Sequence, residues 1–329
     1  MATNSHHLNL RGAASRVAVA AVLALAACSI SPPTAAAVTP HKTTCKPPAS
    51  ASYGWPLRPF HTQHAVRGFF GDPRIARGRT GVIRSFHFGI DIAGDDGTPV
   101  YATLTGRVRG GNSHHDVVAI AGSNGRVFSY WHVVPAVRRG AHVVAYKTLI
   151  GHIAPTWGHV HFAEFRSGTA LNPLRPGALG PYADTMKPLI TGLGLPQSGL
   201  AEAPVAALTG PTELVVEAHD NPQMRVPSPW DDLAAAPALV RWRIDHQRWV
   251  TAVDFRKVVP KPDAYDAAYA YHTHQNRPHR RGHYLIYLAR SWDPSNVAPG
   301  RHSLHVMVAD IRGNTATASV AFTIAGEGS

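Results

Sequence analysis

Three short segments carry the clearest pattern in the chain: FHFGID at residues 86–91, YWH at 130–132 and GHVHF at 158–162. Together these pieces supply four histidines and an aspartate. A catalytic Zn²⁺ typically takes three protein ligands from His, Asp and Glu and leaves a fourth position for water. Two imidazoles and a carboxylate could therefore hold one metal ion, and two further imidazoles would remain for acid–base work.

The first piece must bend if it is to offer two ligands to one ion. The residues around His87 are rich in Gly and β-branched types, which favours strands and turns over a helix. On a straight strand, His87 and Asp91 would lie roughly 13 Å apart. Gly89, midway between them, is the residue that we expect to allow the bend.

The last piece places His159 and His161 on one face of a strand, roughly 6.6 Å apart at the backbone. That spacing suits one of them as a ligand and its neighbour as a partner of the metal's water. His132 follows an apolar strand and could face the water from the other side. With 21 histidines in the chain, a single H-x-H would mean little, but the ordered set favours a metal centre.

The segment from about Tyr53 to Ser167 resembles the lysostaphin-type (LytM-like) zinc endopeptidases, which cut peptide bridges in bacterial peptidoglycan. The resemblance is carried, in order, by GFFGDPR, HFGIDI, GTPVYA, the Tyr-x-His and the H-x-H-F. It implies one Zn²⁺ bound by His87, Asp91 and His161, and a small antiparallel β-sheet domain with a groove. It also implies that His132 and His159 are the catalytic pair.

The sequence departs from the family pattern at three places. The residue before the middle histidine is Trp131 where a glycine is usual, and the residue before the H-x-H is Gly158 where a proline or similar residue is usual. Some relatives carry a tyrosine shortly before the first ligand, whereas residues 75–86 contain none and offer Arg84 as a substitute.

The N-terminus predicts export. Residues 1–27 form a signal peptide with a basic start and the apolar run VAVAAVLALAA, which is shorter than the roughly 20 residues that span a bilayer. The run leads to Cys28 in a context that resembles the bacterial lipoprotein signal, so we predict lipidation of Cys28 and a membrane anchor facing the cell wall. The alternative is cleavage near residues 35–37 and a secreted protein. Only Cys45 remains besides Cys28, which excludes a Cys-ligated metal.

The charge favours anionic partners. The net charge is +12, and removal of the signal with its two arginines leaves about +10 (12 − 2). Peptidoglycan and anionic wall polymers are therefore expected partners, and export argues against nucleic acid.

The rest of the chain predicts an all-β protein of two domains. Residues 28–50 read as a Pro/Ala/Thr-rich linker, 51–174 as the LytM-like domain and 175–210 as a connector. In residues 211–329, alternating apolar runs predict a β-sandwich that resembles bacterial immunoglobulin-like domains. The candidate strands there are ELVVEAHD, LVRWRID, WVTAVDF, HYLIYLAR, RHSLHVMVAD and ATASVAFTI.

Residues 263–283 form a long polar insertion in that region. A surface loop is the simplest interpretation, while contact with wall polymer or a second metal site at His272, His274, His279 and His283 are alternatives. For the whole chain, the alternatives to an enzyme are a non-catalytic envelope scaffold, or an activator of a separate cell-wall hydrolase, and an adhesion protein with a structural zinc. The complete set of five site residues argues against a scaffold, and a structural zinc would need a fourth protein ligand.

Overall fold

The fold was determined as a computed structural model that describes residues 51–112, 116–123, 125–194, 208 and 210–326. The described residues belong to one compact unit, Pro47–Ser329. The predicted signal peptide, the linker, Cys28 and Cys45 lie outside the described residues, so lipidation stays a prediction. Within the described ranges, no helix has the length and hydropathy needed to cross a membrane.

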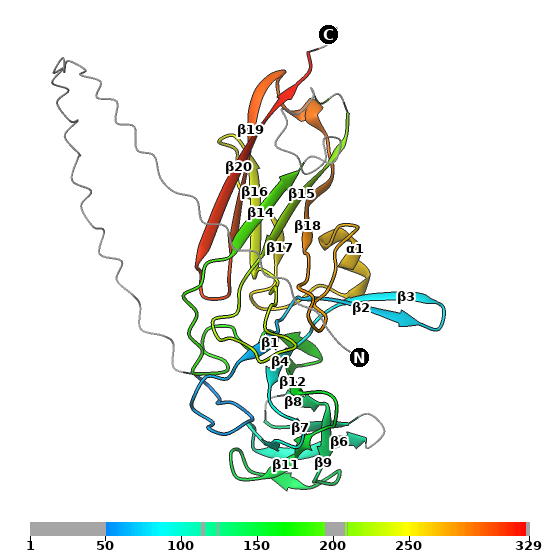
Figure 1. Ribbon diagram of the computed structural model, residues 1–329, viewed down its shortest axis with the longest axis vertical. Coiled ribbons are helices and arrows are strands. Elements are labelled where there is room, and N and C mark those ends of the chain that lie inside the picture. The colour runs from blue at the N-terminus through cyan, green and yellow to red at the C-terminus, as the bar shows by residue number, and fades with distance from the viewer. Residues whose placement is uncertain (1–50, 113–115, 124, 195–207, 209, 327–329) are drawn as a thin grey trace, which may run out of the picture. The chain divides into compact units, whose positions relative to one another are not determined.

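An antiparallel eight-stranded sheet forms the first half of the structure (Figure 1). Its strands follow the order β1-β4-β12-β8-β7-β6-β10, and β13 pairs with β12. They are β1 (Val66–Gly68), β4 (Ile90–Ala93), β6 (Gly106–Asn112), β7 (Val117–Ala121), β8 (Arg126–Trp131), β10 (His142–Val143), β12 (His159–Arg166) and β13 (Thr169–Leu171). The central strand β12 is buried along its first six residues, because it lies between β4 and β8 with both faces covered.

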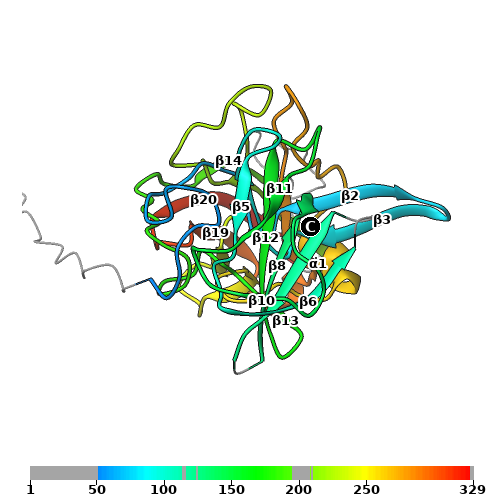
Figure 2. The same ribbon diagram turned by 90° about the horizontal axis from the view of Figure 1, so that it is seen from below.

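Two smaller units flank this sheet. Strands β5 (Pro99–Tyr101), β11 (Leu149–Ile153) and β9 (Val133–Pro135) form a three-stranded sheet, and β5 and β11 lie side by side in Figure 2. Strands β2 (Pro73–Gly78) and β3 (Gly81–Phe86) form a hairpin that extends away from the sheets in both views. The hairpin matters for the site because β3 ends at Phe86 and the next residue is His87, the first of the site histidines.

The second half contains two more antiparallel sheets, with strand orders β14-β15-β18 and β17-β16-β19-β20. Their strands are β14 (Leu189–Gly194), β15 (Thr212–His219), β16 (Leu239–Ile244), β17 (Val250–Asp254), β18 (Leu285–Trp292), β19 (Gly300–Ala309) and β20 (Thr315–Ile324). All six strands expected after residue 211 are present, and β14 adds a strand within the segment that we expected to be a connector. The described helices are short: α1 (Tyr265–Ala268), η2 (Pro262–Ala264) and η3 (Pro294–Asn296). The all-β prediction is therefore confirmed.

The two halves share a hydrophobic core next to the site. Phe86, the last residue of β3, packs its ring against Phe255 and Tyr265 at centroid distances of 5.5 Å each. The Tyr269 hydroxyl donates a hydrogen bond to the Gly71 carbonyl at 2.8 Å. Burial of these aromatic rings, about 150–250 Å² each, fixes the segment that leads into the site on the core of the C-terminal half.

Candidate metal centre

Strand register brings the aspartate and the last histidine together. His161 on β12 lies opposite Asp91 on β4 and, on its other side, opposite Trp131 on β8. His87 follows β3, where its backbone N–H donates to the Asp72 carbonyl at 2.8 Å. The chain bends at residue 89 before β4 begins, so two residues four positions apart can face one point.

Gly89 is required for a second reason that the sequence did not reveal. A Cβ atom at this position would lie 2.8 Å from Cε1 and 2.9 Å from Nε2 of His161, and 2.5 Å from the Phe162 carbonyl oxygen. Real Cβ atoms essentially never approach backbone so closely. The glycine therefore permits both the bend and the close packing of β12.

Replacement of Gly89 by alanine is expected to displace the His161 ring and to lower zinc affinity by about 10- to 100-fold, the effect typical of disturbed ligand orientation. Zinc titration of the metal-free protein measures this. Gly110→Ala is the matched control, since a Cβ there meets nothing within 4 Å. Unchanged zinc affinity in Gly89→Ala would contradict the packing argument.

Three donor atoms converge between these strands. His87 Nε2 lies 2.7 Å from His161 Nδ1 and 3.1 Å from Asp91 Oδ1, and His161 Nδ1 lies 3.0 Å from the same oxygen. Ligand atoms placed about 2.0–2.1 Å from a tetrahedral zinc are roughly 3.3 Å apart. The separations observed are close to that value, and His87, Asp91 and His161 are buried. The trio therefore fits a zinc ion as three corners of a tetrahedron.

The imidazole tautomers also fit a metal. The Nδ1–H of His87 donates to the Phe69 carbonyl at 2.9 Å, which leaves a lone pair on Nε2 facing the other two donors. His161 faces them through Nδ1, and its Nε2 is buried without a hydrogen-bond partner among the described residues. Both ligand lone pairs are thus directed at the same point.

The surroundings keep the Asp91 carboxylate ionised and the His87 imidazole neutral. Burial raises the pKa of Asp91, but the His87 and His159 imidazoles and the Arg74 guanidinium outweigh it, so the pKa lies well below its usual value. Burial, followed by the charge of Arg74, lowers the pKa of His87 to about 3. An anionic oxygen and a neutral imidazole are the forms that bind zinc.

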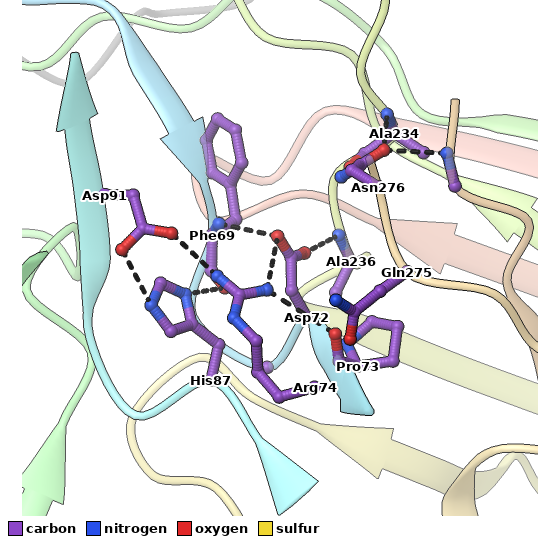
Figure 3. A network of polar contacts seen from close by, with 12 residues as sticks. Phe69, Asp72, Pro73, Arg74, His87, Asp91, Ala234, Ala236, Gln275 and Asn276 are labelled. Carbon is purple, nitrogen blue, oxygen red and sulfur yellow. Dashed lines mark hydrogen bonds and ion pairs between the residues drawn. The ribbon is translucent and has the colours of Figure 1, made fainter. Parts of the chain in front are cut away.

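Arg74 on β2 is a contact that sequence reasoning missed. Its Nη2 donates to Asp91 Oδ2 at 2.8 Å, so Asp91 offers only Oδ1 to the other two donors. Figure 3 shows Arg74 between Asp91 and Asp72. Asp72 in turn accepts the backbone N–H of Phe69 at 2.7 Å and that of Ala236 at 2.7 Å. Through this network, the C-terminal half holds the arginine that orients a candidate ligand.

Arg84, which we considered as a substitute for the missing tyrosine, is exposed and lies 3.8 Å from Asp266. It does not line the cavity at the metal trio.

The two remaining histidines lie beside the trio. The rings of His132 and His159 have centroids 4.7 Å apart, and His159 Nε2 lies 3.5 Å from Asp91 Oδ1. The Nδ1–H of His159 donates to the Trp157 carbonyl at 2.7 Å, so its Nε2 lone pair faces the site. Burial is the main cause that lowers the pKa of His132 to about 3 and that of His159 to about 4, so both are neutral at physiological pH.

Trp157 fixes the position of His132. The two rings stack at a centroid distance of 3.5 Å with an interplanar angle of 14°. His132 adopts a φ of 64°, a region that few residues other than glycine enter without support. The loop that carries Trp157 is held by Asp96, whose carboxylate accepts the backbone N–H groups of Thr156 at 2.6 Å and Gly158 at 2.9 Å.

All five predicted site residues line one cavity of about 390 Å³. Its far wall comes from the C-terminal half through Trp230, Gln275 and Asn276. Asn276 is buried and hydrogen-bonded to the Ala234 carbonyl at 2.7 Å, and Gln275 accepts the Ile75 backbone N–H. Part of the 263–283 insertion is thus a wall of the cavity. Its histidines form no group of metal-ligand atoms within the described residues.

Asp184, Asp220 and Asp310 form a second cluster, with carboxylate oxygens within 4.8 Å of one another. Each already accepts a backbone N–H, from Met186, Asn221 and Arg312 respectively. Burial and the neighbouring carboxylates raise the pKa of Asp220 to about 8, and burial raises that of Asp184 to about 6. We assign this cluster no ligand.

The cluster makes stability depend on pH. The folded state keeps a proton on Asp220 that the unfolded chain releases above about pH 4, so this residue destabilises the fold as pH rises from about 4 to about 8. Asp220→Asn cannot ionise, and we expect it to raise the free energy of unfolding at pH 8 by on the order of 5 kcal/mol, with little change at pH 4. Denaturant unfolding at both pH values measures this, with the exposed Asp95→Asn as control. Equal stabilities of Asp220→Asn and wild type at pH 8 would refute the assignment.

Comparison with known proteins agrees with this geometry. Residues 85–173 match the sequence model of peptidase family M23, a range that contains all five site residues. A search of the curated proteins gives no match.

Solved structures that resemble the chain include a zinc-containing peptidase from Vibrio cholerae, at 20% identity over 40% of this chain and 41% of that one, with a TM-score of 0.31. LytU matches at 25% identity over 36% of this chain and 86% of that one, with a TM-score of 0.27. A SpoIIQ–SpoIIIAH pore-forming complex matches at 25% identity, over 33% and 81%, with a TM-score of 0.29. Superpositions with such low TM-scores carry no functional weight.

The family model supports the resemblance to peptidase family M23 for residues 85–173, whereas the immunoglobulin-like resemblance of residues 211–329 stays a prediction. Members of peptidase family M23 are zinc enzymes. The chain carries a domain of peptidase family M23 with its His-Asp-His metal site intact.

Proposed function

We propose that this protein is an exported zinc endopeptidase that hydrolyses peptide cross-links of bacterial peptidoglycan. The observation that carries the proposal is the convergence of His87 Nε2, Asp91 Oδ1 and His161 Nδ1 in a cavity that two more imidazoles line. The family whose model matches residues 85–173 acts on peptidoglycan, which supports the choice of substrate.

In this proposal His87, Asp91 and His161 hold the zinc ion. When bound, zinc would polarise the scissile carbonyl and lower the pKa of a water molecule towards 7. Arg74 fixes the Asp91 carboxylate through Oδ2, so that Oδ1 stays directed at the two ligand nitrogens. The ligands are thereby preorganised, which lowers the cost of binding the ion.

His159 and His132 handle the proton and the developing negative charge. His159 presents the lone pair of Nε2, because its Nδ1–H is engaged by the Trp157 carbonyl, and this lone pair can accept a proton from the attacking water. His132, held flat against Trp157, is placed to donate a hydrogen bond to the oxyanion as it forms. Both imidazoles are neutral before the reaction, so His159 has a lone pair available for a proton and His132 keeps an N–H to donate.

We further propose that residues 211–329 are an immunoglobulin-like sandwich that serves as a wall of the substrate cavity. Its strands lie in two described sheets, β15-β18 with β14 added from the preceding segment and β17-β16-β19-β20, and these support a sandwich. Anchoring through Cys28 would place the protein at the membrane, facing the wall that it cuts.

Digestion of isolated peptidoglycan tests the function. We expect the purified protein to release new amino groups, detected by mass spectrometry of the fragments, and we expect a chelator to stop their release. The masses identify the bond that is cut. A zinc-loaded protein that binds peptidoglycan without releasing amines would refute the endopeptidase and favour the non-catalytic scaffold.

A further inference from the structure

A second cavity of about 950 Å³ adjoins the candidate metal centre. The two cavities share three lining residues, namely Arg67, Trp157 and Trp230. A peptide whose scissile bond lies at the metal trio would therefore extend past these three side chains into the larger cavity. The charged and polar side chains that line the larger cavity would then help to determine which peptides the enzyme accepts.

Among the described residues that line both cavities, Arg67 is the cation. It lies on β1, half-buried, with its guanidinium 4.4 Å from the centre of the Trp230 ring. Within the described residues it makes no hydrogen bond and no ion pair, so its N–H donors remain free. Arg74, by comparison, is bound to Asp91. A half-buried guanidinium with free donors in a substrate cavity is suited to a carboxylate, which it can bind in a bidentate manner.

Asp91 and Asp96 attract the Arg67 guanidinium electrostatically, but neither forms an ion pair with it. Both oxygens of Asp96 accept backbone N–H groups of the 156–158 loop. Asp95 is exposed and forms no ion pair with Arg67. Two more arginines, Arg58 and Arg225, line the same cavity, so its charge favours an anionic ligand.

We infer that Arg67 binds a free carboxylate of the peptide strand that is cut, and so selects peptides that carry a negative charge beside the scissile bond. Trp230 supports the guanidinium through a cation–π contact, so the C-terminal half contributes to the same subsite. This inference rests on the proposed endopeptidase function.

The test compares two substrates that differ only in this charge. Soluble muropeptides are used with free carboxylates and after conversion of the carboxylates to carboxamides with carbodiimide and ammonia. We expect the zinc-loaded wild type to cleave the free-acid form with a KM about 10- to 100-fold lower than that of the amidated form, the range of charge-assisted hydrogen bonds. In Arg67→Ala this preference should vanish through a rise in KM for the free acid only, at nearly constant kcat. Arg67→Lys should restore part of it.

Arg107→Ala is the matched control, because Arg107 is exposed and lines neither cavity. Equal losses for both substrates in Arg67→Ala, or an unchanged preference, would overturn the inference while leaving the endopeptidase intact.

Binding of the same muropeptides, measured by calorimetry, decides the matter if the wild type cleaves neither. Loss of free-acid binding in Arg67→Ala then supports the carboxylate subsite although the proposed enzyme fails, and equal binding of both forms overturns it. If Arg67→Ala loses affinity for polyphosphate but not for muropeptides, Arg67 recognises an anionic polymer and the carboxylate assignment is wrong.

Discussion

Replacement of His161 by alanine is expected to abolish zinc binding and peptidoglycan cleavage together. The change removes one of three donor atoms from the candidate centre, where Nδ1 of His161 lies 2.7 Å from His87 Nε2 and 3.0 Å from Asp91 Oδ1. A catalytic metal supplies several kcal/mol of transition-state stabilisation, and loss of about 4 kcal/mol slows a reaction by about 1,000-fold. We therefore expect a rate at least about 1,000-fold lower and less than a stoichiometric amount of zinc.

Elemental analysis of zinc per chain, together with amine release from peptidoglycan, measures both parts of this prediction. His142→Ala is the control, because His142 is exposed on β10 and does not line the cavity. Thermal unfolding of the metal-free proteins separates loss of the ligand from loss of the fold, since His161 is buried against Phe88 and Trp131. A His161→Ala protein that folds, retains one zinc and cleaves at the wild-type rate would disprove the ligand assignment.

Replacement of His132 by asparagine is expected to leave zinc in place and to slow cleavage by about 100- to 10,000-fold, the usual contribution of a general acid or base. Asparagine is chosen because His132 has a φ of 64°, which asparagine tolerates better than most residues. The side chain is not one of the three converging donors, so zinc content should stay at one ion per chain. The loss should appear in kcat, because the imidazole acts in the transition state.

His272→Asn provides a matched control, since His272 has a φ of 72° and is exposed. A kinetic comparison of the two variants at equal zinc content isolates the imidazole from the backbone. Full activity of the zinc-loaded His132→Asn enzyme would remove His132 from the catalytic pair.

A metal centre among these residues could be predicted from sequence because its signals are local, and the family resemblance then singled out His87, Asp91 and His161. The H-x-x-x-D and H-x-H patterns lie within single strands or turns, and the glycine between His87 and Asp91 marks the bend that joins them. The strands after residue 211 were equally accessible, since alternation such as that of Val306 and Val308 follows directly from the pleat.

The features that the sequence could not reveal depend on contacts between distant residues. Asp72 and Ala236 are 164 positions apart, and Ile75 and Gln275 are 200 apart. No local pattern marks Arg74 as the partner of Asp91, because surface and site arginines look alike in sequence. The length of the 263–283 insertion was the one available signal that this segment had a role, and it did not indicate the metal cavity as the place.

The role of Gly89 could be predicted in part from the sequence. Its position between two expected ligands predicted the bend, whereas the close approach of His161 required the placement of β12 against β4. Likewise, Gly158, which departs from the family pattern, is explained by the loop that carries Trp157, whereas Trp131 packs against Phe88 and His161. The Trp157 loop begins at Thr156 with a φ of 73° and ends at Gly158 with a φ of 58°, and the Trp157 indole supports His132.

Titration of the metal-free protein with zinc, followed by amine release from peptidoglycan, tests whether His87, Asp91 and His161 hold a catalytic metal. The three converging donors predict that activity is absent without metal, rises in proportion to added zinc and saturates at one zinc ion per chain. Full cleavage by the metal-free protein, or one tightly bound zinc ion per chain with no cleavage, would contradict the account.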